Sequence, residues 1–183
     1  QTRFVQGRRQ LVATGANAST DITGRYRLLS LPPGDYAVMG TTRATWPHDS
    51  DPKQVFGYAP TYFPGTSTAA QAQRVKLGVA HEASGIDFNL MAGRTSNVRG
   101  NATSASGLPL GGETVTMVHE IGGPTMWMGS AVAVASTKVA ADGSWALSSI
   151  PPGEYRLSRR TAARGNDPAQ EGLQVLKGEY RLQ

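Results

Sequence analysis

The sequence contains two copies of one motif, and this repeat decides the expected fold. Residues 23–38 read TGRYRLLSLPPGDYAV, and residues 142–157, which lie 119 positions later, read DGSWALSSIPPGEYRL. Seven of the sixteen aligned positions are identical. In each copy, apolar residues alternate with other residues on both sides of a Pro-Pro-Gly turn. Such alternation places one set of side chains on the buried face of a β-strand, so each copy predicts two strands joined by a turn.

The punctuation of the motif supports this interpretation. A glycine follows the first residue of each copy, where a hairpin tip with positive φ is easiest for glycine. Proline lacks the donor that a strand ladder needs, and Pro-Gly suits the central positions of a type II turn. The predicted turn residues are Gly24, Pro33 and Gly34 in the first copy and Gly143, Pro152 and Gly153 in the second. The aromatic residues of the copies, Tyr26, Tyr36, Trp145 and Tyr155, are expected in the core.

The rest of the chain also predicts strands. Arg74–Val79 and Gly85–Met91 alternate in the same way, and no segment of helical length carries apolar residues at helical spacing. The polar segment 92–97 is the expected boundary between two units, residues 1–93 and residues 94–183. The high content of glycine (22) and proline (11) agrees with an all-β chain that is broken by many turns.

The two units are expected to be incomplete at opposite ends. The second unit opens with a strand near Val98, and the same offset places its counterpart before residue 1, so the first unit lacks its opening strands. The second unit is short at its C-terminal end. Exposed strand edges accept strands from neighbouring chains, which predicts head-to-tail self-association. A chain cut from a longer protein, with neighbouring domains, is the other interpretation, and both remain open.

The motif as a whole resembles a known family. Asp21-x-x-Gly24-x-Tyr26 continuing to Leu31-Pro32-Pro33-Gly34-Asp35-Tyr36 is similar to the signature of carboxypeptidase regulatory-like domains, and residues 141–155 match it again. The opening of the second unit, from Val98 to Val115, is similar to the first hairpin of that family. The resemblance implies two tandem immunoglobulin-like, or prealbumin-like, β-sandwiches of a bacterial secreted type. It also implies an accessory role without catalysis.

Composition excludes several classes of function. The chain has no cysteine, so disulfides, thiolate nucleophiles and cysteine-bound metals are excluded. The net charge of +5 is scattered and not gathered in a basic stripe with exposed aromatics, so nucleic acid is not an expected partner. No apolar run reaches the length of a membrane span. No signal segment begins at Gln1, so either none exists or it lies outside this sequence, and an exported chain after processing would look the same.

Few residues suggest catalysis or metal binding. The histidines are His48, His81 and His119, and no Gly-x-Ser-x-Gly elbow is present. A hydrolase that uses His48 or His119 is therefore a minor hypothesis. The cluster His48-Asp49-Ser50-Asp51 is interpreted as a solvated loop in preference to a weak calcium site, because it offers two carboxylates. No metal and no cofactor are expected.

Aromatic residues outside the repeat offer a candidate binding site. The candidates are Trp46, Tyr58, Tyr62 and Phe63, all in the long connection 41–72. Connections of this length are usually functional or disordered. The four residues either pack as a loop over the sheet edge or form a platform for a glycan or a partner protein. Residues 126–128, Met-Trp-Met, are a second apolar spot.

Together these observations predict a non-catalytic structural or adhesion module outside the cell or in the bacterial cell envelope. It would form part of a surface assembly, such as a filament, that inter-chain strand pairing completes. The alternative is a carbohydrate-binding accessory domain that uses the loop aromatics.

Overall fold

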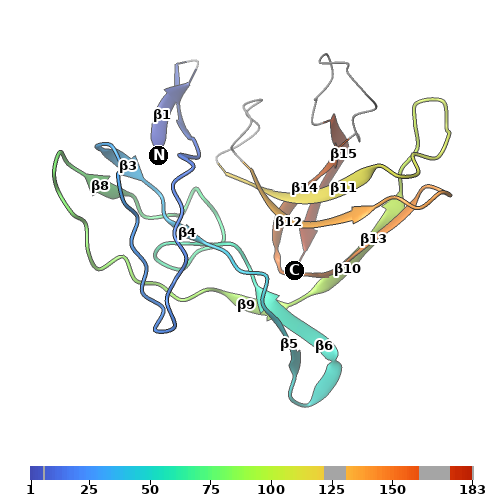
Figure 1. Cartoon of the computed structure of the whole chain (residues 1–183), viewed down its shortest axis with the longest axis horizontal. Coiled ribbons are helices and arrows are strands. Elements are labelled where there is room, and N and C mark those ends of the chain that lie inside the picture. Colours follow the sequence, from blue (N-terminus) through green and yellow to red (C-terminus); the bar gives the residue numbers. More distant parts are fainter. Residues whose placement is uncertain (6, 122–130, 161–173, 183) are drawn as a thin grey trace.

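The protein is all-β. The computed structural model describes residues 1–5, 7–121, 131–160 and 174–182, which form strands, turns and loops and no helix (Figure 1). Accordingly, the described part holds no helix that is long and apolar enough to cross a membrane. The strands form several sheets, and the chain passes from one group of sheets to the next at Thr95.

Short sheets make up the N-terminal half. Most of their strands are two to four residues long, and β6 is the longest. The antiparallel groups are β1 (Thr2–Val5) with β2 (Arg8–Leu11), β3 (Gly34–Tyr36) with β8 (Val75–Leu77), β4 (Met39–Gly40) with β7 (Thr61–Tyr62), and β5 (Thr45–His48) with β6 (Asp51–Tyr58) and β9 (Ala92–Arg94).

Longer strands build the C-terminal half in two layers. One layer pairs β10 (Ser96–Asn101) with β13 (Ser144–Ile150). The other is a four-stranded antiparallel sheet in the order β12 (Ala131–Lys138), β11 (Thr114–Glu120), β14 (Gly153–Arg160) and β15 (Gln174–Leu182).

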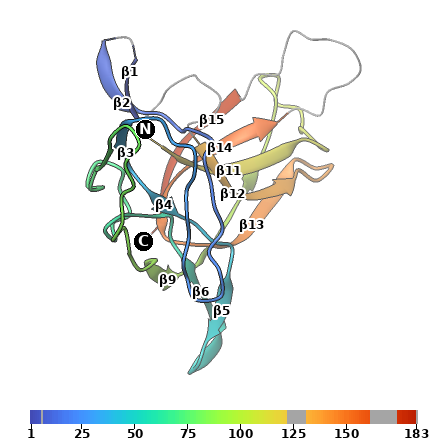
Figure 2. The same cartoon turned by 60° about the vertical axis from the view of Figure 1, so that its left-hand side comes forward.

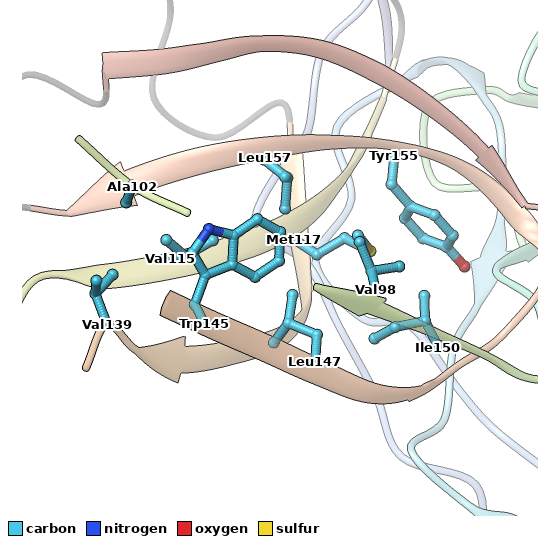
Figure 3. Close-up of a cluster of buried hydrophobic side chains, with 10 residues drawn as sticks. All are labelled: Val98, Ala102, Val115, Met117, Val139, Trp145, Leu147, Ile150, Tyr155 and Leu157. Atoms are coloured by element: carbon cyan, nitrogen blue, oxygen red, sulfur yellow. The ribbon is translucent and has the colours of Figure 1, made fainter. Parts of the chain in front are cut away.

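A hydrophobic core fills the space between these two layers (Figure 3). Val115 and Met117 of β11 are fully buried and face Leu147 and Trp145 of β13 across the core. Burial of each such side chain contributes about 1.5 to 3 kcal/mol. Among the described residues, those of this cluster therefore contribute most to the stability of the C-terminal half.

The two copies of the motif adopt the same backbone conformation. Gly24 and Gly143 have φ of 82° and 87°, and Ser30 and Ser149 both have φ of 57°. In each copy the glycine N–H closes a turn to the carbonyl three residues earlier, at 3.0 Å and 2.9 Å. In both copies the returning strand pairs antiparallel with a strand later in the chain, Gly34 with Leu77 and Gly153 with Leu182. The repeat in sequence is thus a repeat of the turns and of the returning strand.

One strand of the first copy is missing, which corrects the prediction. Residues 25–31 join no ladder with the strands that the structure describes, although Tyr26 and Leu28 alternate with exposed neighbours as expected. The equivalent strand β13 is held by β10, whereas the described residues place no strand beside residues 25–31. Without a neighbour to accept and donate hydrogen bonds, an alternating segment stays extended but does not form a strand.

The predicted strand at Gly85–Met91 is corrected for the same reason. Ile86, Phe88 and Leu90 are half-buried and alternate with exposed residues, yet the segment joins no ladder. By contrast, the prediction for residues 74–79 is confirmed in its centre by β8. Alternation in sequence predicts which face of a segment is covered, and the ladder depends on a partner elsewhere in the chain.

The long connection 41–72, expected to be a loop, contains a hairpin. β5 and β6 pair along Thr45–Gly57 and project away from the rest of the molecule (Figures 1 and 2). Pro47 lies in β5, whose outer edge is unpaired among the described strands, so the missing N–H breaks no ladder there. The sequence did not predict these strands, because Pro47 and Pro52 argue against a strand there.

The halves meet where the second Pro-Pro turn sits on two glycines. Gly57 of β6 and Gly93 of β9 are opposite each other in register. A Cβ on Gly93 would overlap Pro152 Cγ, and one on Gly57 would lie 3.5 Å from Pro151 Cγ. Pro151 is buried. The absence of side chains at this pair therefore lets the proline turn approach the backbone of the N-terminal half.

Candidate functional site

An aromatic row on the β5–β6 hairpin is the best candidate for a binding surface. Trp46 is directly opposite Phe56, and its ring centroid lies 6.3 Å from that of Phe56 and 4.7 Å from that of Tyr58. His48 continues the row at 5.2 Å from Phe56. Residues two apart in a strand share a face, so the pairing of β5 and β6 places all four rings on one side of the hairpin.

The rings of this row remain accessible. Trp46, Phe56 and Tyr58 are half-buried and His48 is exposed. Their hairpin projects at the lower end of the molecule in both views (Figures 1 and 2). Trp and Tyr combine an apolar ring with a hydrogen-bonding group, which suits them to surfaces that bind partially polar ligands.

A cleft of about 540 Å³ adjoins the row at Tyr58. Both halves line it, with residues 41–45, Tyr58 and Pro60 on one side and residues 132–135 and 148–151 on the other. Its polar groups are mainly hydroxyls, together with the Arg43 guanidinium, for which the described residues provide no ion pair. The volume falls within the range of small-molecule sites, which combine apolar walls with a few polar groups.

The structure divides the four residues that the sequence proposed as a site. Trp46 and Tyr58 lie together on the hairpin. Tyr62 and Phe63 are 1% and 8% exposed, so they are interior residues and do not extend that surface. Phe63 packs edge-on against Phe88 at 6.1 Å. For these two residues, the geometry agrees with the alternative of a packed loop.

Tyr62 instead joins the two halves through a buried hydrogen bond. His119, 5% exposed on β11, contacts the Glu154 carbonyl oxygen with Nδ1 at 3.1 Å and the Tyr62 hydroxyl with Nε2 at 3.2 Å. A carbonyl can only accept, so Nδ1 donates to it and Nε2 accepts from the tyrosine hydroxyl. Burial raises the pKa of Tyr62 to about 12, which keeps this donor protonated.

His119 and His48 have different surroundings. His119 makes the two buried contacts just described. His48 Nδ1 lies 2.8 Å from Ser50 Oγ in the exposed hairpin turn. The nearby Asp51 carboxylate accepts from the Lys53 N–H and from Gln54 Nε2, so it does not orient the imidazole as a catalytic triad requires.

No group of three potential metal ligands gathers among the described residues. This includes the segment 48–51, whose carboxylates lie in the hairpin turn. Residues 126–128, the second apolar spot, lie outside the part of the chain that the structure describes.

Sequence reasoning missed Phe56, and it considered His48 only as a hydrolase residue or as part of a solvated loop, not as a member of this row. The alternation of Phe56 and Tyr58 on either side of Gly57 was the available signal, and it was masked by the prolines nearby. The contribution of the C-terminal half to the cleft depends on tertiary packing and has no local signal. Comparisons with protein-family models, with curated proteins and with solved structures found no match.

Proposed function

We propose that this chain is a non-catalytic adhesion module that binds a glycan at the aromatic row and the adjoining cleft. The observation that carries the proposal is the placement of four accessible rings on one face of a projecting hairpin, beside a cleft lined by hydroxyls. Sugar rings have apolar C–H faces that stack on aromatic rings, and their hydroxyls bond to polar groups at the edge of the stack.

The hydrogen-bonding groups of the cleft favour a sugar over a purely apolar ligand. Thr42, Thr45 and Ser149 supply hydroxyls within the same lining as Tyr58. Arg43 is exposed and adds a cation, which favours a glycan that carries carboxylate or sulfate groups. A purely apolar ligand would leave these groups without partners when it displaced water, at a cost of about 1 to 3 kcal/mol for each buried group.

The architecture proposed for this module is a tandem of two immunoglobulin-like units of the carboxypeptidase regulatory-like type, residues 1–93 and 94–183. Support comes from the motif shared by the two halves, from the matching φ angles of its two copies, and from the antiparallel pairing of both returning strands with later strands. Export to the bacterial surface or envelope, and an accessory role without catalysis, rest on the same resemblance.

The test is binding to an array of neutral and acidic glycans. The native chain is expected to retain an acidic glycan, and Trp46→Ala is expected to weaken that binding at least tenfold with little change in the unfolding midpoint. Phe4→Ala is the matched control, because Phe4 is 74% exposed on β1, away from the hairpin. Arg43→Ala should weaken binding to acidic glycans more than to neutral ones. Absence of glycan binding, or equal loss in Trp46→Ala and Phe4→Ala, would overturn the proposal.

A further inference from the structure

The edge of β10 that faces away from β13 is open. β10 pairs with β13 on one side, and the described residues place no strand on its other side. Such an edge presents unpaired N–H and C=O groups, which readily accept an added strand. An open edge alone does not establish a binding site, so a second and independent observation is needed.

Trp145 provides that observation. Its side chain is 8% exposed, and its indole Nε1 is buried without an acceptor among the described residues (Figure 3). Trp145 belongs to β13, and its indole ring lies over Gly100 of β10. A Cβ on Gly100 would lie 2.8 Å from Cζ2 and 3.4 Å from Nε1 of this ring. The glycine thus leaves room for the indole to extend over the neighbouring strand. Because Nε1 has no acceptor among the described residues, it carries the cost of a buried unpaired donor, which is about 1 to 3 kcal/mol. A bound acceptor would remove this cost.

The first copy of the motif offers an analogue for the acceptor. Tyr26 occupies the position of Trp145 in the repeat, and its hydroxyl donates to the Ile86 carbonyl at 2.7 Å. Ile86 belongs to the extended segment 85–91, in which half-buried apolar residues alternate with exposed polar ones. In the N-terminal half, therefore, a backbone carbonyl of an extended segment accepts a hydrogen bond from Tyr26. Trp145, at the equivalent position, lacks such an acceptor in the part of the chain that the structure describes.

We propose that the open edge of β10 binds an extended segment of another protein, and that a backbone carbonyl of this segment accepts a hydrogen bond from Trp145 Nε1. The segment has the chemistry of residues 85–91, with alternating apolar residues and an acidic residue next to the accepting carbonyl. This site is separate from the glycan surface and does not depend on it.

Charge supports an acidic residue in the added segment. Arg99 lies next to Gly100 on β10, is exposed, and forms no ion pair within the described part of the chain. In the N-terminal half, the exposed Asp87 follows Ile86 directly. A carboxylate in the same position of an added strand would lie beside the Arg99 side chain, where opposite charges on neighbouring strands attract.

A second copy of this chain fits the site less well than another protein does. Its own segment 85–91 has the required chemistry, but the Ile86 carbonyl already accepts from Tyr26. Glu82, just before the segment, also pairs with Arg27 at 3.3 Å. If segment 85–91 paired with another chain, it would have to give up or weaken these two contacts. A segment of the same chemistry that makes no such contacts is therefore the better partner.

The experiment titrates the full chain with a synthetic peptide of residues 84–92, SGIDFNLMA, and follows the indole N–H of Trp145 by nuclear magnetic resonance. Trp145→Phe assigns that signal among the three tryptophans. The peptide is expected to shift the signal, to slow its hydrogen exchange at least tenfold, and to slow exchange of amides in β10. Loss of the donor in Trp145→Phe should weaken peptide binding about fivefold, the equivalent of one ordinary hydrogen bond.

A charge exchange provides the matched control. The peptide with Asp87→Lys should bind the native chain about fivefold more weakly, and Arg99→Glu in the chain should restore its binding. Three results would overturn the proposal. The Trp145 signal could stay unchanged at peptide saturation, the two peptides could bind equally, or the signal could shift with chain concentration alone. The last result would identify a second copy as the occupant.

Discussion

The substitution Gly100→Ala tests the packing of Trp145 against β10 quantitatively. The new Cβ would lie 2.8 Å from Cζ2 and 3.1 Å from Cε2 of the indole, whereas carbon atoms in ordinary contact are about 3.5 to 4.0 Å apart. The ring cannot move away freely, because it is packed within the core cluster with Val115 and Leu147. Overpacking of this kind destabilises by about 1 to 3 kcal/mol.

An opposing term reduces the expected effect. Gly100 has no positive φ, so alanine is compatible with its backbone and should gain about 0.5 to 1 kcal/mol relative to glycine in a strand. From the middle of both ranges, the net loss should be about 1 kcal/mol, or a fall of roughly 2 to 4 °C in the midpoint of thermal unfolding for a chain of this size. Urea and thermal unfolding, followed by circular dichroism, measure it.

A double-mutant cycle with Trp145→Phe isolates the cause. Phenylalanine lacks the indole atoms that meet the new Cβ, so Gly100→Ala in that background should be neutral or slightly stabilising. The coupling between the two substitutions should be about 2 kcal/mol. If Gly100→Ala costs the same in both backgrounds, or costs nothing in the native chain, the proposed contact between the ring and β10 is refuted.

Three further predictions follow from other parts of the structure. Gly93→Ala should destabilise by about 1 to 3 kcal/mol in urea unfolding, because its Cβ would overlap Pro152 Cγ; a change below about 0.5 kcal/mol would contradict the docking of the proline turn. Burial raises the pKa of Tyr62 and of Tyr155 from 10.0 to about 12. The folded chain therefore holds these protons more tightly, and the contribution of the two tyrosines to the unfolding free energy should be constant below about pH 10 and fall towards pH 12, less steeply in Tyr62→Phe; a flat profile between about pH 10 and 12 in the native chain would argue against burial of these hydroxyls. Ser149 has a φ of 57°, so Ser149→Val should destabilise by about 1 to 2 kcal/mol whereas Ser149→Gly should be tolerated; equal unfolding midpoints for the two variants would exclude the left-handed conformation.

The sequence repeat made the C-terminal strands predictable, because alternation and turn chemistry agree there. β13 and β14 follow the second copy of the motif, and Trp145 and Tyr155 are buried as expected. The same pattern misled for residues 25–31 and 85–91. Local alternation is present in both segments, but a strand also needs a hydrogen-bonded neighbour, and pattern alone does not reveal whether one exists.

The candidate site was half predictable. Trp46 and Tyr58 were identifiable as aromatics outside the repeat, and the structure places them in one row. Tyr62 and Phe63 are also aromatic and lie in the same connection, but tertiary contacts with His119 and Phe88 bury them. The cleft was not predictable, because it forms between residues that are about 90 positions apart in the sequence.

Native-state hydrogen exchange on the chain alone tests the central claim most directly. The claim is that both copies of the motif form the same unit and that the first copy lacks a strand neighbour. Amides of residues 144–150 that bond to β10 should be strongly protected, and amides of residues 26–31 should exchange at close to the rate of an unfolded chain. Equal protection of the two segments would show that residues 26–31 have a partner and would contradict the account.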